Sequence, residues 1–346
     1  MQFKGLNGIR AIAAITVLIS HVFIALPQFG FKNPLSSDNE VTGLWAAGLS
    51  VSMFFALSGF LITYWLLNEK QQHQTISIQQ FYKRRFARIG PLYYVVLLGS
   101  LMLLYLFDST MRHSTAAYYV FFASNIPFIL GFAHPLVVHF WSLSVEEQFY
   151  LFWPILLEKV TYKFPQKLIF FIIVYIIATA AAKYFSIKTS IELPYIFLSV
   201  CRFHIMAIGA LAAYFYIQKD VMFIKVMQHQ ILQMISWAYL LLILTTSFHI
   251  ATLVDNVMIA LVTVVLIYGQ QRASPIINLE CKLMYELGAI SYGIYLYHPI
   301  IIYLFSMLFA TTFIHPSWVF IAIALTTIIV SYFSFHYFEK RFLITK

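Results

Sequence analysis

The chain has 346 residues, of which 61% are hydrophobic and only 10% are charged. This composition excludes a soluble globular domain and predicts an all-α, polytopic membrane helix bundle. The net charge of +9 comes largely from Lys and Arg in short loops between apolar runs, where they set topology, so no nucleic-acid partner is expected. Cys201 and Cys281 have no metal-ligand spacing, so neither a disulfide framework nor a metal site is expected.

Ten apolar runs are long enough, with their flanks, to cross a membrane. They lie near residues 7–27, 44–67, 89–107, 148–158, 168–186, 195–217, 231–248, 252–269, 288–310 and 317–338. An eleventh run, near 116–132, is short and is interrupted by Ser124, Asn125 and Pro127. We find no soluble linker or internal repeat, so residues 1–346 are expected to form a single transmembrane domain with no soluble domain.

The positive loops predict the orientation. Basic residues gather between the second and third runs and at the end of the chain, and such segments stay on the cytoplasmic side. They are Lys70, Lys83, Arg84, Arg85, Arg88, Lys340, Arg341 and Lys346. Both termini are therefore expected in the cytoplasm. With both termini in the cytoplasm, ten spans are possible only if residues 108–147 start and finish on the outer side. The run near 116–132 should then be re-entrant or lie along the surface, covered by protein.

The first apolar run contains Arg10 and His21, and an unpartnered charge inside a membrane costs several kcal/mol. Eleven residues make about three helical turns, so the two side chains share one face, about 16 Å apart. That face should point into the bundle. The purely structural interpretation is an Arg that snorkels to the surface and a hydrogen-bonded core His.

A dense basic cluster spans residues 81–91 at the mouth of the third run. Arg84 and Arg88 are one turn apart and could grip a phosphate in bidentate fashion. Topological anchoring, or attraction to anionic lipid, explains the same cluster equally well.

Residues 140–150 open the fourth run with two neighbouring carboxylates. Ser144 followed by Glu147 has the spacing of a capping box, which would explain one of them. Glu146 is left over, beside Trp141, where it could orient or charge-balance a His or bind a sugar hydroxyl.

Two later runs also carry polar groups at membrane depth. Arg202 lies in the sixth run and predicts an anion or a phosphorylated ligand nearby. Ser291, Tyr295 and His298 share one helical face. For His298, next to Pro299, a hydrogen-bonded core His is the simpler interpretation.

Taken together, these stretches resemble the acyltransferase-3 family of membrane acyltransferases, in its single-domain form. Six elements in the family's order carry the resemblance and cover nearly the whole chain: Arg10 with His21, Phe-Phe-x-Leu-Ser-Gly-Phe at 54–60, Arg-Arg-x-x-Arg at 84–88, Trp-Ser-Leu-x-Val-Glu at 141–146, Arg202-Phe203 with Gly209, and Ile-Ser-Tyr-Gly-Ile-Tyr-Leu-Tyr-His at 290–298. The resemblance implies an inner-membrane O-acyltransferase that moves an acyl group, usually acetyl, from cytoplasmic acyl-CoA to a hydroxyl of an envelope polysaccharide or glycolipid sugar.

Physical reasoning and the resemblance together predict roles for these residues. His21 is expected to be the general base, with an acyl-His intermediate as the alternative. Arg10 would steady the donor or a carboxylate, and Glu146 would orient His21 or receive the sugar. The phosphates of CoA are expected at Arg84, Arg85 and Arg88. The expected substrate-binding residues are Trp141, Ser142, Arg202, Tyr295 and His298, and no metal is expected.

The expected partners are an envelope glycan or lipid-linked sugar as acceptor, and membrane lipid. A homo-oligomer and separate envelope proteins both stay open. A transporter or flippase for a lipid-linked sugar is the alternative function, because intramembrane Arg, His and Glu also line translocation paths. A transporter predicts inverted halves, which the sequence does not show. A non-catalytic scaffold would not need Arg10 and His21 to face inward.

Overall fold

The computed structural model describes residues 3–31, 36–37, 40–41, 43–107, 115–159, 163–245, 248–309 and 315–343. Nearly all of this part of the chain is helical, as the apolar composition predicts, and the all-α class is confirmed. The exception is a small antiparallel pair of strands, β1 (Ser36–Ser37) and β2 (Glu40–Val41).

The α-helices follow the apolar runs. They are α1 (Leu6–Ala25), α2 (Gly43–His73), α3 (Ile78–Phe107), α4 (Ala116–Val120), α5 (Asn125–Ile129), α6 (Phe140–Glu158), α7 (Phe164–Thr189), α8 (Leu193–Cys201), α9 (Phe203–Ile217), α10 (Val221–Met227), α11 (Gln230–Thr245), α12 (Thr252–Gln270), α13 (Lys282–Ala289), α14 (Ser291–Phe309) and α15 (Pro316–Phe333). Short 3-10 helices occupy Leu26–Phe29, Pro135–Val137 and Glu339–Arg341, and Ser334–Phe338 forms a π-helical turn.

Within the described residues, eight helical stretches are long and apolar enough to cross a membrane, against the ten runs predicted. The pair α10 and α11, bent by 48°, adds a ninth if the two form one span. The predicted run at 148–158 belongs to α6, whose first half carries Glu146, Glu147 and Gln148 and is too polar to count. Several such spans in one chain make this a multi-pass membrane protein.

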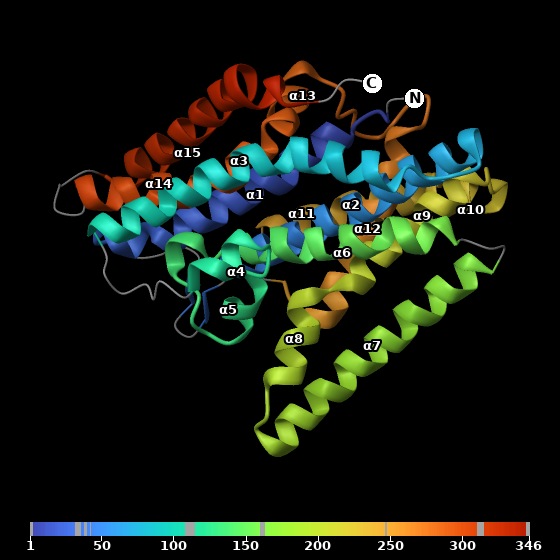
Figure 1. Cartoon of the computed structure of the whole chain (residues 1–346), viewed down its shortest axis with the longest axis horizontal. Helices are drawn as coiled ribbons and strands as arrows, with labels where there is room; N and C mark the ends of the chain where they lie inside the picture. Colours follow the sequence, from blue (N-terminus) through green and yellow to red (C-terminus); the bar gives the residue numbers. More distant parts are fainter. Residues whose placement is uncertain are drawn as a thin grey trace.

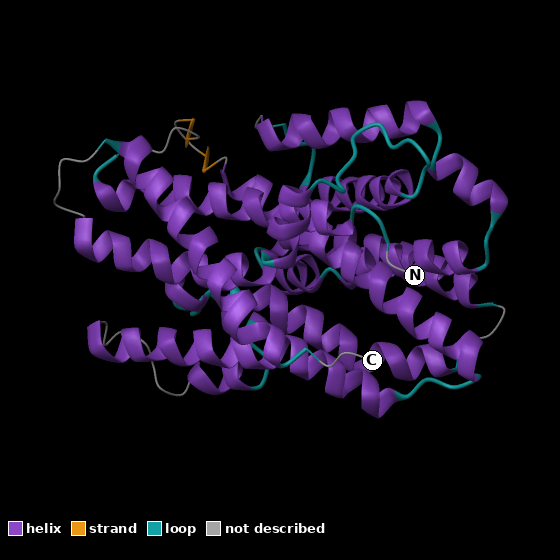
Figure 2. Ribbon diagram, turned by 90° about the horizontal axis from the view of Figure 1, so that it is seen from above, coloured by secondary structure: helices purple, strands orange, loops and turns teal. Residues whose placement is uncertain are grey.

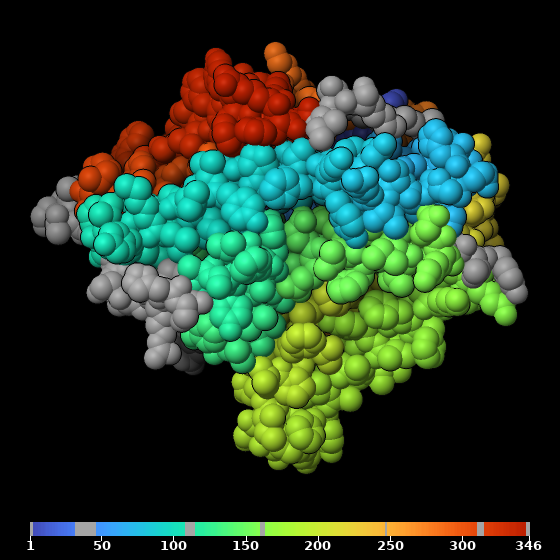
Figure 3. Space-filling model, viewed as in Figure 1, coloured from blue at the N-terminus to red at the C-terminus, as the bar shows by residue number. Residues whose placement is uncertain are grey.

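The helices form one bundle with a projecting arm. Figure 1 shows α1 and α2 running side by side, with α14 and α15 against α1 and α9 and α12 against α2, while α3 contacts α14. The arm is α7, which contacts mainly α8 and α9 and leaves most of its surface outside the bundle. Figure 3 shows α7 and α8 extending from the body of the molecule. In Figures 1 and 2, α1 begins and the final helical turn ends at the same end of the bundle, as two termini on one side of a membrane require.

The tightest helix contact joins α2 and α9. A Cβ added to Gly59 would lie 2.0 Å from the backbone oxygen of Met206, and one added to Gly209 would lie 2.0 Å from that of Ala56. The two backbones are therefore in direct contact. Small residues permit this approach between membrane helices, where packing has to provide much of the association energy.

The interrupted run near 116–132 folds as predicted, without crossing. Helices α4 and α5 have five residues each, so each rises only about 7.5 Å. Hydrogen bonds join this segment to α6: the hydroxyls of Ser124 and Ser144 lie 2.7 Å apart, and Gln148 Nε2 donates to the Phe122 carbonyl at 3.0 Å. Since α6 begins at Phe140, Ser144 lies inside the helix. The predicted capping box is therefore wrong, and the Ser144 hydroxyl serves tertiary packing instead.

Candidate functional site

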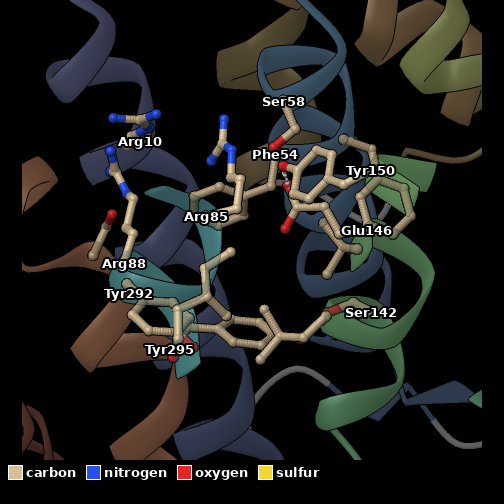
Figure 4. Close-up of a pocket in the computed structure, with 15 residues that line it drawn as sticks. Arg10, Phe54, Ser58, Arg85, Arg88, Ser142, Glu146, Tyr150, Tyr292 and Tyr295 are labelled. Carbon is tan, nitrogen blue, oxygen red and sulfur yellow. Dashed lines mark hydrogen bonds between the residues drawn. The ribbon is translucent and has the colours of Figure 1, made fainter. Parts of the chain in front are cut away.

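A cavity of about 110 Å³ lies in the bundle, between α1, α2, α3, α6 and α14. The charged side chains that line it are Arg10, Arg85, Arg88 and Glu146, so its walls carry a surplus of positive charge. Figure 4 shows the three arginines from α1 and α3, with Ser58, Glu146 and Tyr150 across from them. The lining also includes Ser142 of α6 and Tyr295 of α14.

The side chains of Arg10 and Arg88 lie on the same side of the cavity, opposite Ser58 and Glu146 (Figure 4). In the described part of the chain, neither these two nor Arg85 forms a salt bridge. Arg85 lies over the ring of Tyr150, 4.8 Å from its centroid. A cation at membrane depth is energetically unfavourable unless an anion lies nearby. The cavity therefore favours a negatively charged ligand.

Glu146 is held in place by two hydroxyl groups. Ser58 Oγ of α2 and Tyr150 Oη, one turn further along α6, both donate to Glu146 Oε1, the latter at 2.7 Å. These bonds orient the carboxylate on the wall opposite the arginines.

Tyr295 links α14 to α6 at the cavity wall. Its hydroxyl donates to the His139 carbonyl at 2.8 Å and lies 2.6 Å from Ser142 Oγ. The ring of Tyr295 is 5.9 Å from the ring of His298, centroid to centroid.

His21 does not line the cavity itself. Its ring lies beside that of His298, with centroids 4.9 Å apart and 13° between the planes. His21 Nδ1 and His298 Nε2 are 3.0 Å apart, and His298 Nδ1 lies 3.0 Å from the Ile294 carbonyl. His139 also faces His298, at 5.5 Å between centroids. Ring contacts thus connect the cavity wall to His21 through Tyr295 and His298.

Besides His21 and His298, three more expected site residues do not line the cavity: Arg84, Trp141 and Arg202. Arg84 pairs with Glu69 at 3.2 Å, although Arg88, one turn away, faces the cavity. Arg202 Nη1 donates to neutral acceptors, namely the Gly48 carbonyl, Ser52 Oγ and Asn256 Oδ1, at 3.0–3.1 Å. The Arg202 guanidinium also lies 5.6 Å from the ring of Trp141. Among the described residues, the Arg202 guanidinium is thus hydrogen-bonded by neutral groups and forms no salt bridge.

Sequence reasoning did not assign roles to Ser58, His139, Tyr150 or Tyr292, although each lies at the cavity or beside His298. Ser58 and Tyr150 lie inside the stretches 54–60 and 140–150, which the sequence pattern already indicated as candidate site segments. Which hydroxyl reaches Glu146 depends on how α2 packs on α6. Although imidazoles cluster at His21, no group of three or more His, Cys, Asp or Glu in the described ranges is arranged to hold a metal ion.

The fold and the site together define a multi-pass membrane protein with a positively charged internal cavity. The chain belongs to the acyltransferase-3 family, because the family's model, described as an acyltransferase domain, matches residues 3–336. The predicted resemblance is thereby confirmed.

Two relatives show where the similarity lies. The chain is 31% identical over 170 residues to the O-acetyltransferase OatA of Staphylococcus aureus, covering 46% of this chain and 25% of the relative. It is 32% identical over 162 residues to the peptidoglycan O-acetyltransferase OatA of Listeria monocytogenes, covering 43% of this chain and 23% of that protein. The matched part thus spans about a quarter of these relatives. No solved structure matches the chain.

Proposed function

We propose that this chain is an O-acyltransferase that moves an acetyl or other short acyl group from acyl-CoA to a hydroxyl of an envelope polysaccharide or glycolipid sugar. The observation that carries this proposal is the set of three arginines, without salt bridges in the described chain, that line one cavity inside a membrane bundle. A CoA thioester brings several phosphate charges, and guanidinium groups bind phosphate in bidentate fashion. The relatives' names favour acetyl as the group and a glycan as the acceptor.

The basic cluster supports entry of the donor from the cytoplasm. Arg85 and Arg88 lie near the start of α3, where Lys83 and Arg84 add to the basic cluster, and Lys70 lies near the end of α2. Lys- and Arg-rich loops stay on the cytoplasmic side, where acyl-CoA is found. We therefore place both termini in the cytoplasm and the protein in the inner membrane of a bacterial cell.

The donor would extend from the arginines toward His21. Arg10 and His21 lie on the same helix, about 16 Å apart along its axis. An elongated CoA thioester can span that separation if its acyl end passes Tyr295. Arg84, paired with Glu69, would act as an outer attraction for the phosphates.

His21 would act as the general base. Its Nε2 takes the proton of the acceptor hydroxyl while the hydroxyl oxygen bonds to the acyl carbonyl carbon. The carbon–sulfur bond then breaks, and the same proton passes from His21 to the departing sulfur, leaving free CoA and a sugar ester. Glu146, fixed by Ser58 and Tyr150, would receive a polar group of the donor or the sugar.

Two measurements test this function. The first is CoA binding by the purified protein, which separates a CoA-dependent transferase from a transporter or a scaffold. The second is the ester-linked acyl content of envelope glycans in cells with the native chain or with His21→Ala, at matched membrane abundance. Binding together with loss of the esters supports the proposal. An equal ester load in both strains contradicts it and favours the transporter.

A further inference from the structure

The hydrogen bonds of His298 determine where its proton lies. The Ile294 carbonyl, 3.0 Å from His298 Nδ1, can only accept a hydrogen bond. His298 Nδ1 must therefore carry a proton and donate it. In a neutral imidazole the second nitrogen, Nε2, then has a lone pair and accepts.

The lone pair on His298 Nε2 in turn determines where the proton of His21 lies. His298 Nε2 lies 3.0 Å from His21 Nδ1, so the proton between them belongs to His21 Nδ1. His21 Nε2 is then left with its lone pair, in the form that a general base needs. Free histidine side chains prefer the opposite tautomer, with the proton on Nε2. In that tautomer Nε2 has no free lone pair and could not accept a proton from a hydroxyl.

A neutral His298 fits its surroundings. The side chain is 1% exposed, and the rings that face it are His21, His139 and Tyr295, none of which is an anion. A protonated His298 would be a cation enclosed by two imidazoles and a phenol. Such an uncompensated charge is unfavourable in a dry interior.

We propose that His298 is a positioning residue, which holds His21 in the tautomer with a proton on Nδ1 and an open Nε2. This inference rests on the proposed function, in which His21 is the base. When His21 becomes a cation during transfer, its Nδ1 proton keeps the same acceptor, so the ring does not have to turn. His298 itself touches neither the donor nor the acceptor in this scheme.

Two variants of His298 isolate the acceptor. His298→Gln and His298→Met both remove the Nδ1 donor and have similar volumes. In the Gln variant, the Ile294 carbonyl attracts the amide NH₂, which turns the amide oxygen toward His21 Nδ1. Met offers only a weak sulfur acceptor. The pair therefore differs mainly in whether His21 Nδ1 keeps a hydrogen-bond acceptor.

The direct test is ¹⁵N NMR of the full chain, labelled at histidine, in lipid nanodiscs, with the His21 signals assigned from those absent in His21→Ala. We expect a protonated Nδ1 and an unprotonated Nε2 in the native chain and in His298→Gln, and the reverse in His298→Met. Protonated Nε2 in the native chain would overturn the proposal. This measurement needs no turnover, so its result is independent of the proposed function.

The second test is activity, measured as ester-linked acetyl on envelope glycans per unit of protein in the membrane, with CoA affinity of the purified protein as the control. We expect His298→Met to lose about 100-fold in transfer, within the range that a positioned base contributes, with unchanged CoA affinity. His298→Gln should recover most of the loss. Equal loss in both variants, or a parallel loss of CoA binding, would show a merely structural role and overturn the proposal.

Discussion

Arg10 of α1 and Arg88 of α3 line the same side of one cavity, and in the described chain neither forms a salt bridge. They come from helices that are far apart in sequence. Two cations held this close repel each other, and an anion between them would remove that repulsion. The arrangement therefore favours ligand binding over stability of the empty bundle.

The arginines should differ in their effect on donor binding. Replacing Arg88 with Gln should weaken CoA binding about 10- to 100-fold, because a hydrogen bond to a charged group contributes about 1.5–3 kcal/mol. The comparison is Arg84→Gln, which removes a guanidinium that pairs with Glu69 outside the cavity and should weaken CoA binding by a smaller factor. Equilibrium binding of CoA to the purified variants measures both. Equal losses at the two positions would place the phosphates outside the cavity.

The hydroxyl groups around Glu146 should matter for activity. Tyr150→Phe removes one of the two donors to Glu146 Oε1 and should lower glycan ester content about tenfold at matched abundance, since the carboxylate loses part of its orientation. Tyr94→Phe is the matched control, because the Tyr94 hydroxyl donates to the Val120 carbonyl outside the cavity. Normal ester content in Tyr150→Phe would show that Glu146 has no role in the transfer step.

Arg202 should affect stability more than ligand binding. Its Nη1 joins Gly48, Ser52 and Asn256, so Arg202→Met should lower the free energy of unfolding by about 3 kcal/mol, because three hydrogen bonds of about 1 kcal/mol each are lost. CoA affinity of the folded fraction should stay at the native value. Thermal unfolding in detergent and CoA binding, measured on the same samples, separate the two effects. A large fall in affinity without a lower melting temperature would mean that Arg202 contacts the ligand.

The contact between α2 and α9 gives a test of the fold. Gly59→Ala should destabilise the protein by about 1–3 kcal/mol, because its methyl group meets the Met206 backbone oxygen and the helices must separate. Gly99→Ala on α3 has open space around its Cβ and should instead stabilise by about 0.5–1 kcal/mol through helix propensity. Melting temperatures of the two variants should therefore move in opposite directions from the native value.

Several features could be predicted from the sequence because they depend on local pattern. Apolar run length predicted the membrane helices, since a span needs about 20 apolar residues regardless of its neighbours. The interruptions at Ser124, Asn125 and Pro127 correctly indicated a segment that does not cross. Helical periodicity placed Arg10 and His21 on one helix, as the structure has them.

Partners between helices could be decided only by the tertiary structure. The sequence suggested that Arg84 and Arg88 act together, yet one pairs with Glu69 and the other faces the cavity. For His298 a hydrogen-bonded core His was the simpler interpretation, and only packing showed that it meets His21, 277 positions away. Local periodicity determines which face of a helix a side chain occupies, whereas the atom it meets depends on how distant helices pack.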